Sequence, residues 1–113
     1  VNYCLGCHTA KYQRYIRAAE DLDIPEDLMT EHLIFGDQKI GEQMTSAMDP
    51  KLAAKWFGAT PPDLTNEVNL RGADWVYTYL RTFYVDEIRP YGVNNVVYPA
   101  VGMPNVFAEL QGV

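Results

Sequence analysis

Two cysteines and a histidine stand within five residues near the start of the chain, in the order Cys4-Leu5-Gly6-Cys7-His8. This C-x-x-C-H spacing is the one at which two thiols attach to a haem and the next residue ligates its iron. Cysteines three residues apart face the same side of a helical turn, so both can reach the porphyrin while the imidazole lies over the metal. The motif therefore predicts a covalently bound c-type haem (iron) and electron transfer as its use.

Three other uses of this motif fit the sequence less well. A zinc site would need four ligands, and beyond the motif the chain offers only His32 and no third cysteine. A thioredoxin-like C-x-x-C would follow a strand, and residues 1–60 show almost no period-two alternation. A disulfide between cysteines three apart would close too short a loop to stabilise much.

A haem iron with one histidine ligand has a second axial position, and we expect Met103 to occupy it. Gly102 before it permits close backbone approach to the ring, and Pro104 after it stiffens the loop. The competing candidates are Met29, Met44, Met48 and His32. A methionine taken alone more often fills a gap in a core, and His32 is more often an ordinary helix residue.

Hydrophobic spacing and caps predict helices separated by long irregular connections. A first helix should carry the motif and run to about Leu22, and a second should begin at Asp23 as N-cap and end near Phe35-Gly36. Further helices are predicted over residues 50–57, between an Asp49 cap and Gly58, from Asp74 to Arg89-Pro90, and from Pro104 onward; residues 59–64 should be extended and residues 91–102 a loop or short hairpin. The fold class expected is all-α, with one domain over residues 1–113.

Charge is distributed unevenly along the chain. The 113 residues are 48% hydrophobic and carry a formal charge of −6, which argues against nucleic-acid binding. Residues 20–49 hold nine acids against Lys39 alone and so sum to −8, while all other residues sum to +2. The acidic segment could simply be a solvated surface, or it could steer a basic electron carrier toward the haem. No run of 18 apolar residues occurs.

Several segments together resemble the cytochrome c1 family, the haem subunits of the ubiquinol:cytochrome c oxidoreductase (bc1) complex, in its bacterial form. Besides the C-x-x-C-H motif, the matching segments are residues 56–65 (Trp-Phe-Gly-Ala-Thr-Pro-Pro-Asp-Leu-Thr), 71–80 (Arg-Gly-Ala-Asp-Trp-Val-Tyr-Thr-Tyr-Leu), 95–99 (Asn-Val-Val-Tyr-Pro) and 102–104 (Gly-Met-Pro). The family's domain begins further upstream and continues into a C-terminal membrane anchor. The chain is therefore expected to be a truncated soluble core with a cytochrome c-like haem fold.

The resemblance implies roles for individual residues. Ala59, Pro61 and Pro62 would pack beside the haem, and Arg71 would pair with a haem propionate, although an exposed charge at a helix entry is the plainer alternative. Trp75 and Tyr79 would pack against the macrocycle. The cofactor-binding set expected is thus Cys4, Cys7, His8, Ala59, Pro61, Pro62, Arg71, Trp75, Tyr79 and Met103, with His8 and Met103 as the metal ligands.

The same resemblance implies a function without bond chemistry of its own. The haem would take an electron from a Rieske iron-sulfur subunit, beside cytochrome b, and pass it to a soluble cytochrome c on the periplasmic side of the inner membrane. The alternatives are a freestanding periplasmic c-type shuttle, a haem-based ligand sensor or peroxidase-like domain with an open distal position, and a zinc-binding interaction module.

Overall fold

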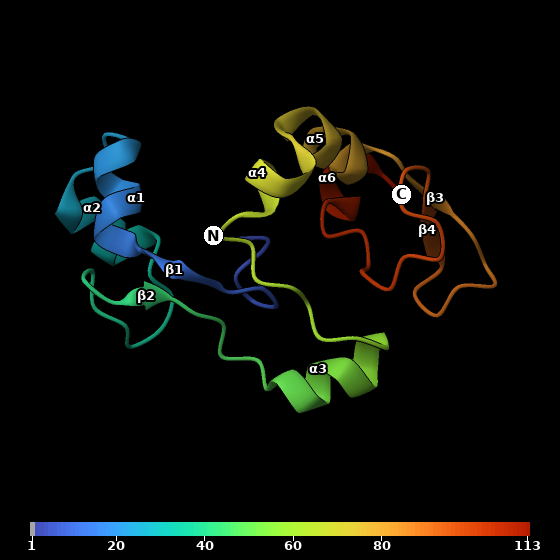
Figure 1. Cartoon of the computed structure of the whole chain (residues 1–113), viewed down its shortest axis with the longest axis horizontal. Helices are drawn as coiled ribbons and strands as arrows, with labels where there is room; N and C mark the ends of the chain where they lie inside the picture. The colour runs from blue at the N-terminus through green and yellow to red at the C-terminus, as the bar shows by residue number, and fades with distance from the viewer. Residues whose placement is uncertain (1) are drawn as a thin grey trace. The chain divides into compact units, whose positions relative to one another are not determined.

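The computed structural model describes residues 2–113 and divides them into two compact units. Unit 1 comprises the described residues up to Met48 together with Pro62–Thr65, and unit 2 comprises Asp49–Pro61 and Asn66–Val113. Figure 1 labels their elements along the chain. Within residues 2–113, no helix is both long and apolar enough to cross a membrane.

Unit 1 combines two short helices with a two-stranded sheet. Its elements are β1 (Ala10–Arg14), α1 (Tyr15–Asp21), α2 (Glu26–His32) and β2 (Gln43–Met44). The strands pair antiparallel, with Ala10 opposite Met44 and an irregularity before Arg14. Five buried residues form the core of this unit, namely Tyr15, Ala19, Met29, Ile34 and Met44.

The prediction that one helix carries the motif and runs to Leu22 is wrong. Residues 2–7 form turns, β1 follows, and only Tyr15–Asp21 is helical. The reason is non-local, because the backbone N–H of Lys11 donates to Asp63 and that of Tyr12 donates to Thr65. These donors would serve the ladder of a helix, but here they bind a segment more than fifty residues away.

The second predicted helix is shorter than expected. Asp23 is not its cap but adopts a left-handed conformation with φ of 53°. The helix begins after Pro25, which occupies the N-cap position, and ends at His32. The proline fixes the backbone at this entry, so the helix starts one residue after it.

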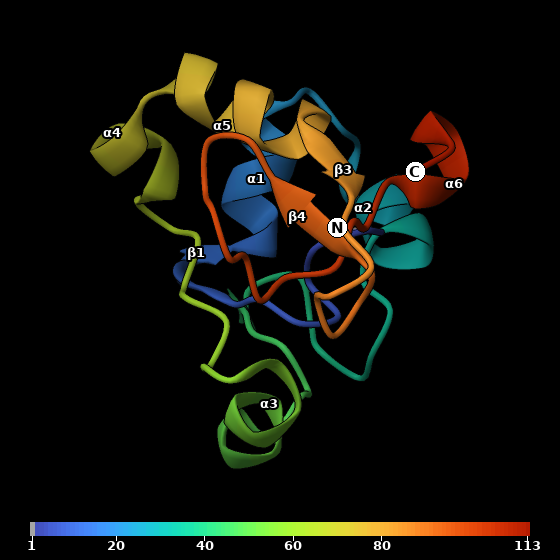
Figure 2. The same ribbon diagram turned by 90° about the vertical axis from the view of Figure 1, so that its right-hand side faces the viewer.

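Unit 2 contains four helices and a β-hairpin, seen from a second side in Figure 2. The elements are α3 (Pro50–Phe57), α4 (Glu67–Arg71), α5 (Ala73–Arg81), β3 (Phe83–Val85), β4 (Val93–Asn95) and α6 (Ala108–Gln111). The hairpin is antiparallel, with Phe83 opposite Asn95 and Val85 opposite Val93. Phe83, Val93 and Val101 form a second buried cluster, with Tyr79 and Met103 packed against it.

The α3 prediction is confirmed in both its bounds and its caps. The Asp49 carboxylate accepts the N–H groups of Lys51 and Leu52, which satisfies two of the free donors at the helix start. Gly58 ends the helix with φ of 80°, a conformation that favours glycine.

The helix expected from Asp74 to Arg89 ends instead at Arg81. Phe83, Tyr84 and Val85 leave the helix and pair with β4, as suits aromatic and β-branched residues. The short strand or hairpin expected within residues 91–102 is confirmed as one strand, β4, whose hairpin partner β3 lies before that range. The final helix spans only Ala108–Gln111.

The all-α fold class is therefore wrong. The described residues are 36% helical and 12% in strands, and the strands form two separate antiparallel sheets. The chain has a mixed α and β architecture in which each unit holds one small sheet. The first sheet pairs β1 with the distant β2, and the second pairs β3 with β4 in a hairpin. Helical periodicity reports neither pairing.

Asn95 organises the end of the hairpin through its side chain. It is completely buried. Its Nδ2 donates to the carbonyl of Tyr79 at 2.7 Å, while its Oδ1 accepts from the N–H groups of Val97 and Tyr98 at 3.0 and 3.2 Å. The side chain thus satisfies the last turn of α5 and the loop after β4 together.

We predict that Asn95→Ala destabilises the protein by about 1–3 kcal/mol, because it leaves buried backbone groups without partners. Urea unfolding followed by circular dichroism measures this loss. Asn69→Ala, at an exposed position of α4, is the matched control and should stay within about 0.5 kcal/mol of the parent. Equal stability of the two variants would contradict the role assigned to Asn95.

Candidate haem site

The C-x-x-C-H segment forms a single tight turn. The carbonyl of Cys4 accepts the N–H of Cys7 at 3.1 Å and that of His8 at 2.9 Å, so the turn includes one helix-like bond across four residues. Cys4 is half-buried and Cys7 exposed, and both thiols are free. The turn therefore fixes the backbone that bears all three functional side chains while leaving the sulfurs available for thioether bonds.

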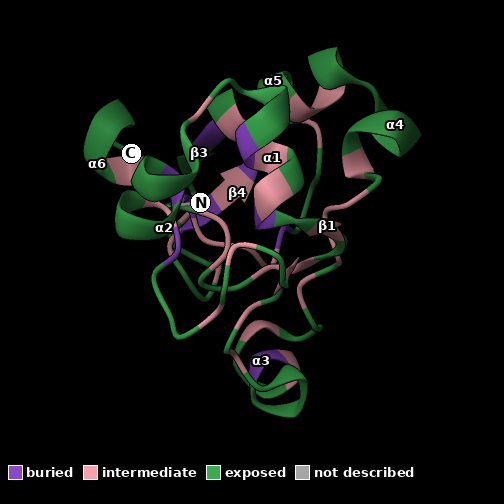
Figure 3. Cartoon of the chain, turned by 90° about the vertical axis from the view of Figure 1, so that its left-hand side faces the viewer, coloured by how far each residue is buried: buried purple, intermediate pink, exposed green. Residues whose placement is uncertain are grey.

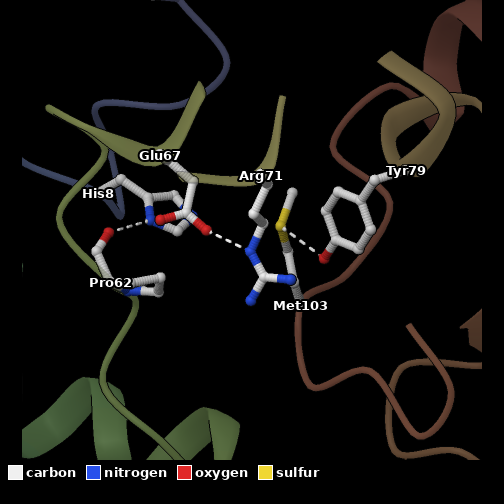
Figure 4. Close-up of polar contacts among 6 residues, drawn as sticks. All are labelled: His8, Pro62, Glu67, Arg71, Tyr79 and Met103. Atoms are coloured by element: carbon white, nitrogen blue, oxygen red, sulfur yellow. Dashed lines mark hydrogen bonds and ion pairs between the residues drawn. The ribbon is translucent and has the colours of Figure 1, made fainter. Parts of the chain in front are cut away.

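The His8 imidazole is oriented by a backbone carbonyl. Its Nδ1 lies 2.8 Å from the carbonyl oxygen of Pro62 (Figure 4). A carbonyl only accepts, so Nδ1 holds the proton and donates it, and the lone pair of the neutral ring is on Nε2. Metal-ligating histidines typically have this arrangement, in which the second nitrogen donates to a carbonyl. The donor set of this segment fits a haem iron.

The contact between His8 and Pro62 lies within a larger set of bonds. The Asp63 carboxylate accepts from the Thr9 hydroxyl at 2.9 Å, from the Lys11 N–H at 2.8 Å and from the Thr65 N–H at 2.8 Å. Hydrogen bonding to Thr65 contributes most, followed by that to Lys11 and Thr9, and together these bonds hold the pKa of Asp63 well below its usual range. We call the three bonds from Thr9, Lys11 and Thr65 the Asp63 link.

Met103 lies half-buried against the core of unit 2. The Tyr79 hydroxyl donates to its sulfur at 3.4 Å (Figure 4). Burial, with a smaller contribution from Tyr98, raises the pKa of Tyr79 to about 12, so the hydroxyl keeps its proton at neutral pH. The Met103 thioether is thus half-buried and accepts a hydrogen bond from a hydroxyl that stays protonated.

The loop before Met103 is positioned by its backbone. Nη2 of Arg89 donates to the carbonyls of Ala100 and Val101 at 3.0 and 3.1 Å. A Cβ at Gly102 would lie 2.7 Å from the carbonyl oxygen of Phe57, so only glycine fits without a shift. Gly102 thus permits a close approach of this loop to the end of α3, and its expected approach to a haem ring stays a prediction.

Two aromatic rings on α5 stack on each other, and an arginine of α4 lies over one of them. The rings of Trp75 and Tyr79 are parallel within 7° at 5.2 Å, and the Arg71 guanidinium lies 4.3 Å from the Trp75 ring centroid. Nε of Arg71 also donates to Glu67 at 2.6 Å. No residue of α5 is buried, as its green and pink ribbon in Figure 3 shows, so the face expected to pack against a macrocycle is accessible.

The structure therefore groups the predicted residues in two sets. In unit 1 it joins Pro62 to His8 beside the two cysteines, and in unit 2 it joins Arg71, Trp75, Tyr79 and Met103 in one chain of contacts. Ala59 and Pro61 belong to the irregular segment after α3, where Ala59 is exposed and Pro61 half-buried. The roles of all ten residues toward a haem stay predictions.

The competing axial candidates have ordinary surroundings. Met29 and Met44 are buried in the core of unit 1, as expected of gap-filling methionines. His32 is exposed at the end of α2, with Nε2 3.8 Å from the Glu31 carboxylate. Met48 is half-buried. Among residues 2–113, no three His, Cys, Asp or Glu side chains form a group that could hold a metal ion.

Sequence reasoning missed three residues that position the candidate site. In the sequence, Asp63 and Asn95 stand out only as members of segments that match the family, and Arg89 only as the end of a helix. Each acts through hydrogen bonds to backbone groups distant in the sequence, for which no local pattern exists. The one available signal was the Pro-Pro-Asp sequence, because a carboxylate directly after two prolines has ready access to neighbouring backbone donors.

Comparison with known proteins gives two strong matches over almost the whole chain. The chain is 55% identical over 112 residues to cytochrome c1 of Allochromatium vinosum, covering 99% of this chain and 46% of that protein. It is 47% identical over 112 residues to a protein named ammonia monooxygenase gamma subunit from Nitrosomonas europaea, covering 47% of it. No family model matches the chain.

The chain thus spans about half the length of the curated relatives it matches. The predicted resemblance to cytochrome c1 is confirmed, and it extends over 99% of the chain.

Proposed function

We propose that this chain is the haem-binding part of a cytochrome c1 and that it transfers electrons within a bc1 complex. The observation that carries the proposal is the C-x-x-C-H turn, whose histidine is held by the Pro62 carbonyl with Nε2 left to ligate iron. The 55% identity to cytochrome c1 supports this particular complex.

In this proposal each residue has a defined task. Cys4 and Cys7 would supply the thioether sulfurs, and His8 would hold the iron through Nε2. Met103 would hold it through its sulfur, to which the protonated Tyr79 hydroxyl donates. When bound, the haem supplies a one-electron redox centre, and its methionine ligand gives a higher potential than a second histidine would.

The remaining predicted residues bind the edges and faces of the cofactor. Arg71 offers a planar cation with further N–H donors beyond the one directed to Glu67, which suits a propionate. Trp75 and Tyr79 offer flat apolar rings that exclude water. Ala59, Pro61 and Pro62 would pack beside the ring.

The wider setting follows from the same proposal. The electron would come from a Rieske iron-sulfur subunit, with cytochrome b in the same complex, and would leave to a soluble cytochrome c. The site would be at the periplasmic side of the inner membrane, on a subunit anchored there. A ligand sensor would instead bind carbon monoxide readily in the reduced state, which separates it from a carrier closed by methionine.

The attachment test uses the two thiols. We expect the haem to stay with the denatured polypeptide through acid-acetone extraction, because thioether bonds survive unfolding, and Cys4→Ala combined with Cys7→Ala should abolish this retention. Absorbance of the extracted polypeptide in alkaline pyridine measures it. Haem that is freely extracted from the parent chain would contradict the c-type assignment.

The ligation test uses Met103→Leu, which nearly conserves volume. The variant should keep its haem and fold but lose the near-infrared charge-transfer band of thioether-ligated ferric haem, and its midpoint potential should fall. Met48→Leu, at a half-buried position in unit 1, is the control and should leave both unchanged. Persistence of the band in Met103→Leu would transfer the ligand role to another residue.

The partner test uses the acidic segment, whose nine acids are all exposed. If they steer a basic cytochrome c, the second-order rate of electron transfer falls steeply with ionic strength. Asp23→Asn combined with Glu26→Gln and Asp27→Asn should flatten this dependence, as stopped-flow measurement over a salt series would show.

Neutralising three acids elsewhere provides the control for that experiment. Asp74→Asn combined with Glu87→Gln and Glu109→Gln removes the same charge from exposed positions of unit 2. Equal flattening in both triple variants would mean that only net charge matters. A salt-insensitive parent would leave the segment as a solvated surface.

A further inference from the structure

The Asp63 link joins the residue after His8 to the residue after Pro62. Thr9 directly follows His8, and Asp63 directly follows Pro62, so the bond between the Thr9 hydroxyl and the Asp63 carboxylate lies one residue from the imidazole on one side and one from its acceptor on the other. A displacement of either segment would therefore alter the distance between Nδ1 and the Pro62 carbonyl.

Both carboxylate oxygens take part. Oδ2 accepts from the Thr9 hydroxyl and the Lys11 N–H, while Oδ1 accepts from the Thr65 N–H. The backbone adds a bond from the Leu64 N–H to the Thr9 carbonyl at 2.7 Å. Three donors converge on one side chain, so an acceptor-only group is required at this position.

Proline makes this external support necessary. Pro61 and Pro62 have no N–H, so neither residue can anchor this segment by donating a backbone hydrogen bond. The Pro62 carbonyl shares one planar peptide unit with the N–H of Asp63, so the placement of Asp63 affects its direction.

We propose that Asp63 is a positioning residue for His8, which holds the Pro62 carbonyl against Nδ1 and so fixes the ring's tautomer, orientation and donor strength. This inference rests on the proposed haem function. A hydrogen bond from Nδ1 increases the electron donation of the opposite nitrogen, which stabilises ferric over ferrous iron. Loosening the link therefore weakens this donation and raises the midpoint potential.

The test compares Asp63→Asn with the parent holoprotein. Asparagine keeps the volume but places an amide donor where one oxygen accepted, so it opposes one of the N–H groups. In the low-spin ferric state, the hyperfine-shifted Nδ1 proton of His8 should exchange with solvent about tenfold faster or more in the variant. The midpoint potential, measured by spectroelectrochemistry, should rise.

Two smaller substitutions distinguish a positioning effect from misfolding of the Asp63→Asn variant. Thr9→Val removes one donor of the link and should shift exchange and potential in the same direction by less, whereas Thr9→Ser retains the hydroxyl and should match the parent. Asp86→Asn is the matched control, because the Asp86 carboxylate also accepts from a backbone N–H and an amide, in the hairpin of unit 2. It should leave both haem readouts unchanged.

The outcomes separate the two proposals. Asp63→Asn and Thr9→Val with lowered unfolding stability but parental proton exchange and potential would overturn the positioning role while leaving the haem function intact. A parent holoprotein that shows no covalent haem or no hyperfine-shifted imidazole would overturn the proposed function and this inference with it.

Discussion

The bonds between residues 8–12 and residues 62–65 are the constraint on which unit 1 depends. They close a separation of more than fifty residues, and such a closure costs conformational entropy that a single bond would not offset. Several bonds together offset this entropy, and the pKa of Asp63 is low because its carboxylate accepts several of them. The conformation of β1 and the tautomer of His8 both follow from this one joining of two segments.

The two proposed axial residues are held by different physical means. His8 depends on a charged acceptor next to its own carbonyl partner. Met103 depends on a cation that binds two loop carbonyls, on a glycine without room for a Cβ, and on a hydroxyl that touches its sulfur. A thioether has no proton to orient, so shape and packing suffice for it, whereas an imidazole needs its second nitrogen assigned.

Local signals account for what the sequence predicted well. The Asp49 cap, the glycine after Phe57 and the C-x-x-C-H turn are each specified within a few residues, and the structure keeps the first two as predicted. The strands β1 and β3 were not predicted for the opposite reason, since β1 is extended because of Asp63 and Thr65, and β3 because of β4. Helical spacing at Tyr12 and Tyr15, or at Tyr79 and Phe83, carries no information about such distant partners. The same holds for Asp63, Arg89 and Asn95, whose importance lies in backbone groups far along the chain.

Arg71 shows how the plain and the functional interpretations of a residue can both hold. It forms an i,i+4 ion pair with Glu67, as an exposed helix charge does, and that pair alone is worth little. Its guanidinium also lies over Trp75 and 5.7 Å from the centroid of Tyr98, and stacking fixes its plane. Glu67 accepts from Nε, and a guanidinium has four further N–H donors in the same plane. The ion pair thus orients the guanidinium but uses only one of its N–H donors. A second carboxylate can therefore bind in that plane while Glu67 remains in place.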